Sequence, residues 1–437
     1  MSLISRFLPL SFVLFACLLV VASPTSSAAA NRAKALVTRG GYAVTREGRL
    51  LESRAIDTAF VPASTIKLVT CLAALEILGR DYRFTTAFFV KDDTLSIRGS
   101  GDPSLTSATV AAIAADLARL GLKEVGDIAL DADSFALSGK ADGADGSANP
   151  YDTANGALAV NYNAVAVTVT DDGRIVSGEE ETPLLPLMKE IGRHLPPGTH
   201  RVNPGAFIAG GRISPTLRYT GELFKAMLER QGIKVGGRIT AAAAPPGVAP
   251  FHTHTSAQTV EDIVRSCLHY SNNYVANQLF LACGARSLGR PATWDKGRQA
   301  LRAFIATAWP QHRHDITIVE GSGLSRRDRI TPAAMLAVLD SFKPYSNLLK
   351  TRDGVPLKTG SLAGVHCYAG YLPRGRELDP FVILLNQRDN TRDPLLARLQ
   401  RLHSIPRRGH RARLTLRRQP APMPGCRADW PPDCAYP

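Results

Sequence analysis

Ser64 and Lys67 lie three positions apart at the start of a long apolar segment, and together they could perform nucleophilic chemistry. In a helix, this spacing places both side chains on one face. Apolar residues occur on every side of the helix predicted from Ser64 to Gly79, which indicates a buried helix. Burial favours the neutral amine of a lysine, and such an amine is a general base for a neighbouring hydroxyl. Taken alone, the pair is more typical of a helix cap and a solvated lysine.

Two further motifs follow in order along the chain. Ser271-Asn272-Asn273 opens a predicted helix, and Lys358-Thr359-Gly360 lies on a predicted strand, with Ser361 behind it. The three motifs in this order resemble those of the active-site serine penicillin-binding proteins and serine β-lactamases. More than twice as many residues separate the first two motifs as separate the last two. The long first interval resembles that of the D-Ala-D-Ala carboxypeptidase/endopeptidase family, the low-molecular-mass class C penicillin-binding proteins, and is too long for a class A β-lactamase.

The resemblance covers roughly residues 35–400 and includes other short segments. These are Gly99–Pro103, Pro150–Asp152, Asn161–Asn163 and Glu320–Arg326. The resemblance implies an α+β fold of the serine β-lactamase/transpeptidase type, in which an antiparallel sheet is sandwiched between helices. It also implies an inserted α/β domain between the first and second motifs. We predict a catalytic domain over residues 31–83 and 216–403, whose first and last strands share one sheet, and an insertion over residues 84–215.

The chemistry begins at Ser64, which would attack a peptide carbonyl and form an acyl-enzyme. Lys67 would take the hydroxyl proton, and the positive charge of Lys358 would lower the pKa of Lys67. Ser271 would relay a proton to the departing amine. Asn273 would hold Lys67 and the substrate amide in place.

The third motif is expected to bind the substrate. Lys358 and Thr359 would hold its terminal carboxylate, and Gly360 would let the substrate pair with the edge of the strand. The resemblance further implies that the backbone N–H groups of Ser64 and Ser361 form an oxyanion hole.

Asp152 and Arg326 match family positions that bind the amine and carboxylate at the free end of a diaminopimelate side chain. Asp152 is equally consistent with a turn residue after Pro150. Arg327 and Arg329 lie beside Arg326, so the register of that match stays open.

A second reading of the middle motif is possible, because Tyr270-Ser271-Asn272 also spells the Tyr-x-Asn of class C β-lactamases, in which tyrosine is the base. The long insertion favours the frame that uses Ser271. We therefore expect a serine-type D-Ala-D-Ala carboxypeptidase/endopeptidase that acts on peptidoglycan stem peptides and cross-links, with β-lactam antibiotics as covalent inhibitors at Ser64. The alternatives are a β-lactamase or esterase on the same scaffold and a non-catalytic cell-wall-binding protein.

The N-terminal segment of the chain suggests export, and the C-terminal segment has a distinct basic composition. Residues 1–30 have a basic start, an apolar run and the small residues Ala28-Ala29-Ala30, as in a secretory signal peptide, so we expect a periplasmic protein. A retained membrane anchor is the alternative. Residues 404–437 form a basic tail rich in Pro and Arg, in which Cys426 and Cys434 are the expected disulfide pair.

The net charge of +14 is compatible with several anionic partners. No segment resembles a nucleic-acid-binding module, so we expect no nucleic acid and propose contact of the tail with the cell wall or a membrane surface. His252 with His254 and His312 with His314 lack a third ligand, so no metal and no cofactor are expected. Cys71 and Cys267 lie in apolar surroundings and are expected to be small core residues.

Overall fold

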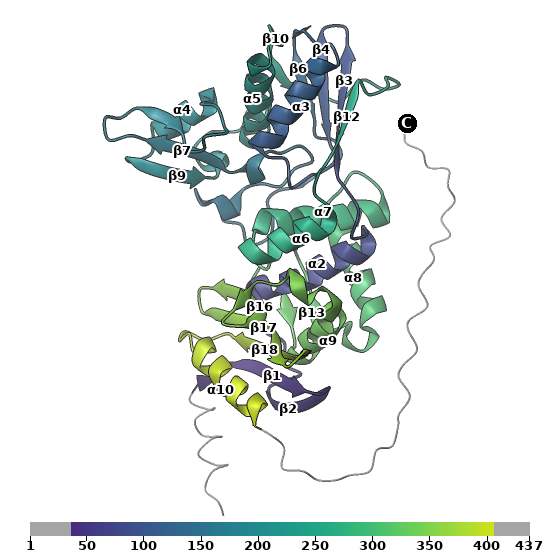
Figure 1. The fold of residues 1–437 in the computed structure, drawn as a ribbon, viewed down its shortest axis with the longest axis vertical. Helices are drawn as coiled ribbons and strands as arrows, with labels where there is room; N and C mark the ends of the chain where they lie inside the picture. The colour runs from purple at the N-terminus through teal and green to yellow at the C-terminus, as the bar shows by residue number, and fades with distance from the viewer. Residues whose placement is uncertain (1–35, 406–437) are drawn as a thin grey trace, which may run out of the picture.

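Strands from both ends of the chain form one six-stranded antiparallel sheet in the computed structural model, which describes residues 36–405 (Figure 1). Its strands are β1 (Gly40–Arg46), β2 (Arg49–Arg54), β15 (Thr351–Arg352), β16 (Val355–Leu362), β17 (Val365–Arg374) and β18 (Glu377–Leu385). Their order is β15-β16-β17-β18-β1-β2. β1 pairs with β18, which confirms that the first and last strands share a sheet. The predicted signal peptide, the tail from residue 406 and the Cys426–Cys434 pair lie outside the described residues.

Both faces of this sheet are covered, as the alternation of side chains along β17 shows. Cys367, Ala369 and Tyr371 pack into the larger core, whereas Tyr368 and Leu372 pack into a second core on the opposite face. The larger core contains α2 (Lys67–Ile77) and α9 (Pro332–Phe342), and the second core contains α10 (Arg392–Ser404). The antiparallel sheet between helices confirms the predicted fold class.

Helices separate the sheet from the insertion. α6 (Val260–Tyr270), α7 (Asn273–Leu288) and α8 (Trp294–Ala308) pack with α2 in this layer (Figure 1). Residues 68–75 of α2 are all buried, as its all-round apolar sequence predicts. Cys71 and Cys267 are buried free thiols in the same core. Within residues 36–405, no helix combines the length and apolar character needed to cross a bilayer.

The helix that carries Lys67 opens with a 3₁₀ turn. Ser64 lies in this turn, Ala63–Ile66, and the α-helix starts at Lys67. The Thr65 N–H donates to the Pro62 carbonyl three residues earlier, which is the hydrogen-bond spacing of a 3₁₀ helix. The chain is therefore helical at Ser64, as predicted, although its first turn is 3₁₀.

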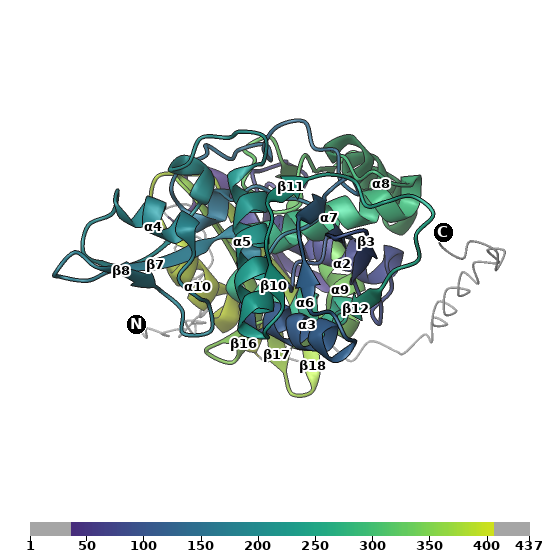
Figure 2. The same ribbon diagram turned by 90° about the horizontal axis from the view of Figure 1, so that it is seen from above.

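The insertion lies on the far side of the helical layer, and Figure 2 looks onto it from above. One five-stranded mixed sheet has the order β11-β6-β4-β3-β12, and a three-stranded sheet has the order β8-β7-β9. The elements of the insertion are β3 (Thr85–Lys91), β4 (Thr94–Gly99), α3 (Ser107–Arg119), β5 (Glu124–Val125), β6 (Ile128–Asp131), β7 (Val165–Val169), β8 (Ile175–Ser177), α4 (Pro186–Gly192), β9 (Gly198–Val202), α5 (Pro215–Arg230), β10 (Lys234–Val235), β11 (Ile239–Ala241) and β12 (His252–Thr255).

Several of these elements lie beyond residue 215. β12 pairs with β3, β11 with β6 and β10 with β5, and α5 packs into the core of the insertion. Their apolar residues have no other core to join, because the catalytic core begins again at α6. We therefore propose that the insertion extends to about residue 256 instead of residue 215.

Candidate active site

The amine of Lys67 joins three parts of the chain. Its Nζ donates to Ser64 Oγ at 2.9 Å, to Asn273 Oδ1 at 2.8 Å and to the Ser322 carbonyl at 2.6 Å. Ser64 is in the turn before α2, Asn273 begins α7, and Ser322 lies in a loop after β13 (Ile316–Thr317). Lys67 is fully buried, and these three contacts satisfy its amine: in its neutral form it donates to Asn273 and Ser322 and accepts from the Ser64 hydroxyl.

Burial lowers the pKa of Lys67, because the surrounding protein solvates the ammonium less well than water does. Cys267, Glu320, Cys71 and Asp328 oppose this shift. The net direction favours a neutral amine 2.9 Å from the Ser64 hydroxyl, where it can accept the hydroxyl proton.

Lys358, on β16, is the second buried lysine of the site. Its Nζ donates to Ser271 Oγ at 2.7 Å and to the Thr359 carbonyl at 2.9 Å. Burial and the charge of Lys67 lower the pKa of Lys358 to about 7. Because the two lysines repel each other, loss of a proton from one favours its retention on the other.

Ser271 is held in an unusual backbone conformation between two helices. Its φ of 55° is left-handed, and it caps the C-terminus of α6 while Asn272 caps the N-terminus of α7. This sharp turn aims the Ser271 hydroxyl at Lys358. Tyr270, the residue that the alternative frame would use, is 81% exposed and has no hydrogen bond within the described chain.

Gly360 brings β16 close to the nucleophile. A Cβ at this position would lie 2.7 Å from the Pro62 carbonyl oxygen and 3.1 Å from the Ser64 nitrogen, so only glycine fits. β15 pairs only with Val355 and Pro356, so the same edge of β16 from Lys358 onward has no strand partner within residues 36–405. This edge can therefore accept an extended peptide by strand addition.

Arg392, at the start of α10, was not predicted as a site residue. Its Nη1 donates to Ser361 Oγ at 2.7 Å and to the Gly360 carbonyl at 3.2 Å, and its guanidinium lies 4.6 Å from the centre of the Tyr368 ring. Arg392 thus adds a positive charge beside the third motif. In the sequence, Arg392 lies between Thr391 and Asp393, and this local pattern does not indicate a site residue.

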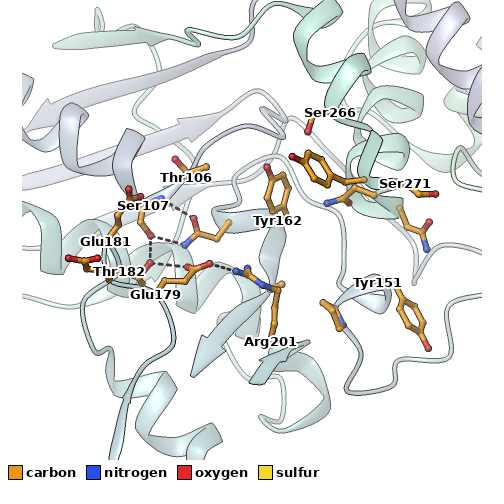
Figure 3. Close-up of a pocket in the computed structure, with 17 residues that line it drawn as sticks. Thr106, Ser107, Tyr151, Tyr162, Glu179, Glu181, Thr182, Arg201, Ser266 and Ser271 are labelled. Carbon is orange, nitrogen blue, oxygen red and sulfur yellow. Dashed lines mark hydrogen bonds and ion pairs between the residues drawn. The ribbon is translucent and has the colours of Figure 1, made fainter. Parts of the chain in front are cut away.

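A cavity of about 980 Å³ opens beside the second motif (Figure 3). One wall contains Tyr270, Ser271 and Asn273, and the other walls come from the insertion. The insertion residues are Thr106, Ser107, Pro150, Tyr151, Asn161, Tyr162, Ala164, Glu179, Glu180, Glu181, Thr182 and Arg201. Glu179 is paired with Arg201, whereas Glu180 and Glu181 are exposed and form no ion pair within the described residues.

The family model for the D-Ala-D-Ala carboxypeptidase 3 (S13) family matches residues 37–191 and 207–357. The chain belongs to this family. The predicted family and the predicted class of serine-type D-Ala-D-Ala carboxypeptidase are therefore confirmed.

Proteins similar to this chain have names that agree with this assignment. The chain is 23% identical to the D-alanyl-D-alanine carboxypeptidase DacB of Haemophilus influenzae, over 76% of this chain and 81% of that protein. It is 25% identical to a D-alanyl-D-alanine carboxypeptidase of an Actinomadura species, over 75% of this chain and 74% of the relative. The crystal structure of penicillin-binding protein 4 from H. influenzae has the same fold, with a TM-score of 0.66 and 19% identity over 85% of this chain and 98% of that chain.

The structure gathers most of the predicted site residues of this S13 protein. Ser64, Lys67 and Asn273 are in contact, and so are Ser271 and Lys358, as described above. Their neighbours Thr359, Gly360 and Ser361 continue along β16 beside the Ser64 turn.

Asp152 and Arg326 lie farther out. Asp152 is buried in the insertion, where its Oδ2 accepts from the Ser147 N–H and hydroxyl, and its Oδ1 has no partner within the described residues. Arg326 is exposed and donates to the Ala363 carbonyl at 2.6 Å, at the end of β16. The structure records no contact between these two side chains in residues 36–405.

Proposed function

We propose that this S13 enzyme is an exported serine D,D-peptidase that cuts peptidoglycan stem peptides through an acyl-enzyme on Ser64. The observation that carries the proposal is the buried Lys67 amine in hydrogen-bond contact with the Ser64 hydroxyl. A serine is a weak nucleophile until a base takes its proton, and burial lowers the pKa of Lys67, which makes its neutral form more available as that base.

In the acylation step, Lys67 takes the Ser64 proton while Oγ attacks the carbonyl carbon of the D-alanyl peptide bond. The backbone N–H groups of Ser64 and Ser361 stabilise the oxyanion, and one such donor typically lowers the barrier by about 3 kcal/mol. Asn273 holds the Lys67 amine, which supports transfer in a fixed geometry.

The tetrahedral intermediate then collapses. The carbon–nitrogen bond breaks, and the departing amine nitrogen receives the proton that Ser64 gave up. We propose that Ser271, whose hydroxyl accepts from Lys358 Nζ, passes this proton from Lys67 to the amine. Water then attacks the ester carbonyl and gives a proton to Lys67. The bond between the carbonyl carbon and Ser64 Oγ breaks, Lys67 returns this proton to Oγ, and the free acid product leaves.

Positive charge along β16 supports recognition of a free carboxylate at the end of the substrate. Lys358 contributes an ammonium, Thr359 a hydroxyl, and Arg392 a guanidinium at the far end. The unpaired edge of β16 would hold the peptide backbone. Asp152 and Arg326 remain our candidates for the free end of a diaminopimelate side chain. The unpartnered Oδ1 of Asp152 suits an ammonium ligand.

The cavity beside Ser271 supports action on cross-links as well as on terminal D-alanine. A departing D-alanine is far smaller than about 980 Å³, whereas a second stem peptide suits a cavity of that size. We therefore propose both carboxypeptidase and endopeptidase activity.

Labelled penicillin tests the proposal. The crystal structure of penicillin-binding protein 4 from H. influenzae is also known in complex with a β-lactam, with a TM-score of 0.62 to this chain and 19% identity. We expect a stable covalent adduct of one label per chain that is absent in Ser64→Ala. Rapid release of hydrolysed penicillin would favour the β-lactamase alternative, and the absence of any adduct would favour the non-catalytic wall-binding protein.

Our proposals for the location of the enzyme and for the role of its tail rest on the sequence alone. We propose export through the signal peptide of residues 1–30 to the periplasm, where peptidoglycan is accessible, and peripheral contact of the basic residues after 404 with the cell wall or a membrane surface. N-terminal sequencing of the mature protein after fractionation checks the first point. A chain that retains residues 1–30 in the membrane fraction would contradict it.

A further inference from the structure

The loop that contacts Lys67 is wrapped around one carboxylate, that of Glu320. Its Oε1 accepts from the N–H groups of Gly323, Leu324 and Ser325 at 2.6, 2.8 and 3.2 Å. Its Oε2 accepts from the N–H and hydroxyl of Ser322 at 2.8 and 2.6 Å. Glu320 is fully buried. Because both oxygens accept from backbone N–H groups, the geometry is that of an ionised carboxylate that fixes the loop.

This loop is one of the three supports of the general base. The Ser322 carbonyl accepts from Lys67 Nζ at 2.6 Å, and the Ser322 N–H is bonded to Glu320. Gly323 packs against the turn of the nucleophile, since a Cβ there would lie 2.1 Å from the Ala63 carbonyl oxygen. Glu320 therefore sets the position of a group that touches Lys67, without touching the substrate-facing surface itself.

A second buried acid, Asp328, lies near Glu320. Asp328 is fully buried, and its Oδ1 accepts at 2.7 Å from the N–H of Val319, the residue before Glu320. Its Oδ2 has no hydrogen-bond partner among the described residues. Burial and the neighbouring charge of Glu320 raise the pKa of Asp328. Two neighbouring buried carboxyl groups do not both ionise readily, so one of them keeps its proton.

We propose that Glu320 is a positioning residue of this active site: Asp328 is protonated and donates to the ionised Glu320, which in turn holds the Ser322 carbonyl against the Lys67 amine. In this arrangement the proton is on Oδ2 of Asp328, so that buried atom gains a hydrogen-bond partner. The inference rests on the proposed function, because it concerns the base that activates Ser64.

The charges around Lys67 allow the proposal to be tested through the pH dependence of the reaction as well as through its geometry. The titratable groups that face Lys67 come from α2, α6, β16 and the loop, and they are Cys71, Cys267, Lys358, Glu320 and Asp328. The negative charge of Glu320 raises the pKa of Lys67 and so opposes the effect of burial. Removal of this charge should therefore let Lys67 lose its proton at a lower pH.

Glu320→Gln tests the positioning role in the full-length enzyme. Whichever way its amide turns, the NH₂ group would face backbone N–H groups that now donate to Glu320, so donor meets donor and the Ser322 carbonyl loses its position. We expect the second-order rate constant for acylation by labelled penicillin to fall by about tenfold or more. The acid limb of that rate constant, measured against pH, should move to lower pH. A role in loop stability alone would reduce the fraction of enzyme that can be acylated and leave the rate constant of the folded fraction unchanged.

Asp328→Asn is the matched variant. The asparagine Oδ1 can still accept from Val319, and its NH₂ can donate to Glu320 in place of the proton. We expect an acylation rate within about twofold of the wild type and an unchanged acid limb. If Asp328 is ionised in the wild type, Asp328→Asn removes a negative charge near Lys67, and the acid limb shifts to lower pH.

Asp131→Asn controls for destabilisation. Asp131 is a buried carboxylate of the insertion that accepts from the Asp133 and Ala244 N–H groups. This variant should lose thermal stability without a change in acylation or its pH dependence. If Glu320→Gln does not fold, Asp328→Asn decides alone: an unchanged limb supports the proposal and a limb shifted to lower pH overturns it.

The outcomes separate this inference from the proposed function. A wild type that takes up no labelled penicillin overturns the proposed function. A wild type that is acylated normally, together with a Glu320→Gln enzyme that matches it in rate and pH limb, overturns only the positioning role. An Asp328→Asn enzyme as slow as Glu320→Gln also overturns it.

Discussion

Lys358 Nζ lies 2.7 Å from the Ser271 hydroxyl, although the two residues are 87 positions apart in the chain. This contact joins β16 to the turn before α7, and it connects the lysine that we propose to bind a carboxylate with the serine that we propose to protonate a leaving amine. Both lysines of the site are buried, so each one's protonation depends on the other.

The pKa of about 7 for Lys358 predicts a limb in the pH profile of the enzyme. Below this pH, Lys358 is charged and can bind the substrate carboxylate, and above it the charge is lost. We expect kcat/KM for a D-Ala-D-Ala peptide to fall as the pH rises through about 7. In Lys358→Arg the descending limb should move to higher pH, because a guanidinium keeps its proton. An unmoved limb would assign the titration to another group.

Variants of Ser271 and Tyr270 distinguish between the two readings of the second motif. Tyr270 points into solvent, whereas Ser271 contacts Lys358, so Tyr270→Phe should retain acylation within about twofold. Ser271→Ala should slow acylation by about a hundredfold or more, as for loss of a positioned proton-transfer group. Stopped-flow measurement of penicillin acylation checks both variants. A large loss in Tyr270→Phe with little loss in Ser271→Ala would reverse the assignment.

Gly360→Ala should be poorly tolerated. The new methyl group would lie 2.7 Å from the Pro62 carbonyl oxygen, so β16 or the Ser64 turn must move. We expect a loss of about 1–3 kcal/mol in the free energy of unfolding and a large loss of acylation. Gly375→Ala, at a position with no atom within 4 Å, serves as the control, although its φ of 62° adds backbone strain. Denaturant unfolding that shows Gly360→Ala to be no less stable than this control would contradict the close approach.

The cavity beside Ser271 predicts a difference between substrates. Glu180 and Glu181 line it without ion-pair partners in the part of the chain that the structure describes, so they could attract an amine on the second strand of a cross-link. We expect Glu180→Gln/Glu181→Gln to lower kcat/KM for a cross-linked dimer by about two- to fivefold and to leave D-Ala release from a pentapeptide unchanged.

The control for the cavity is Glu124→Gln/Glu229→Gln, which removes two exposed carboxylates of the insertion that do not line it. This variant should change neither activity. Equal losses on both substrates in the cavity variant, or equal losses in the control, would refute a role of the cavity in binding the second strand.

The sequence predicted the residue types of the site because its motifs are short and local. Ser64 and Lys67 are one turn apart, and all-round apolar neighbours already indicate that Lys67 is buried. The long first interval correctly indicated an inserted domain. The order of the strands at the two chain ends also indicated one shared sheet, which β1 and β18 form.

Contacts between distant segments could not be predicted in the same way. Lys67 contacts Ser322, which is 255 positions away, and Arg392 reaches Ser361 from the start of the last helix. Strand pairing between β12 and β3 places residues beyond 215 in the insertion, and no local pattern marks that pairing. The five hydrogen bonds to Glu320 likewise depend on a loop shape that the apolar pattern does not encode.

The protonation of Lys67 is the most direct test of the mechanism. Lysines labelled with ¹³C at Cε can be followed by NMR across a pH titration, with the Lys67 signal assigned by its absence in Lys67→Arg. We predict that Lys67 titrates below the ordinary lysine value of 10.5, because burial disfavours its charged form. A Lys67 signal that titrates at or above 10.5 would contradict its role as the base for Ser64.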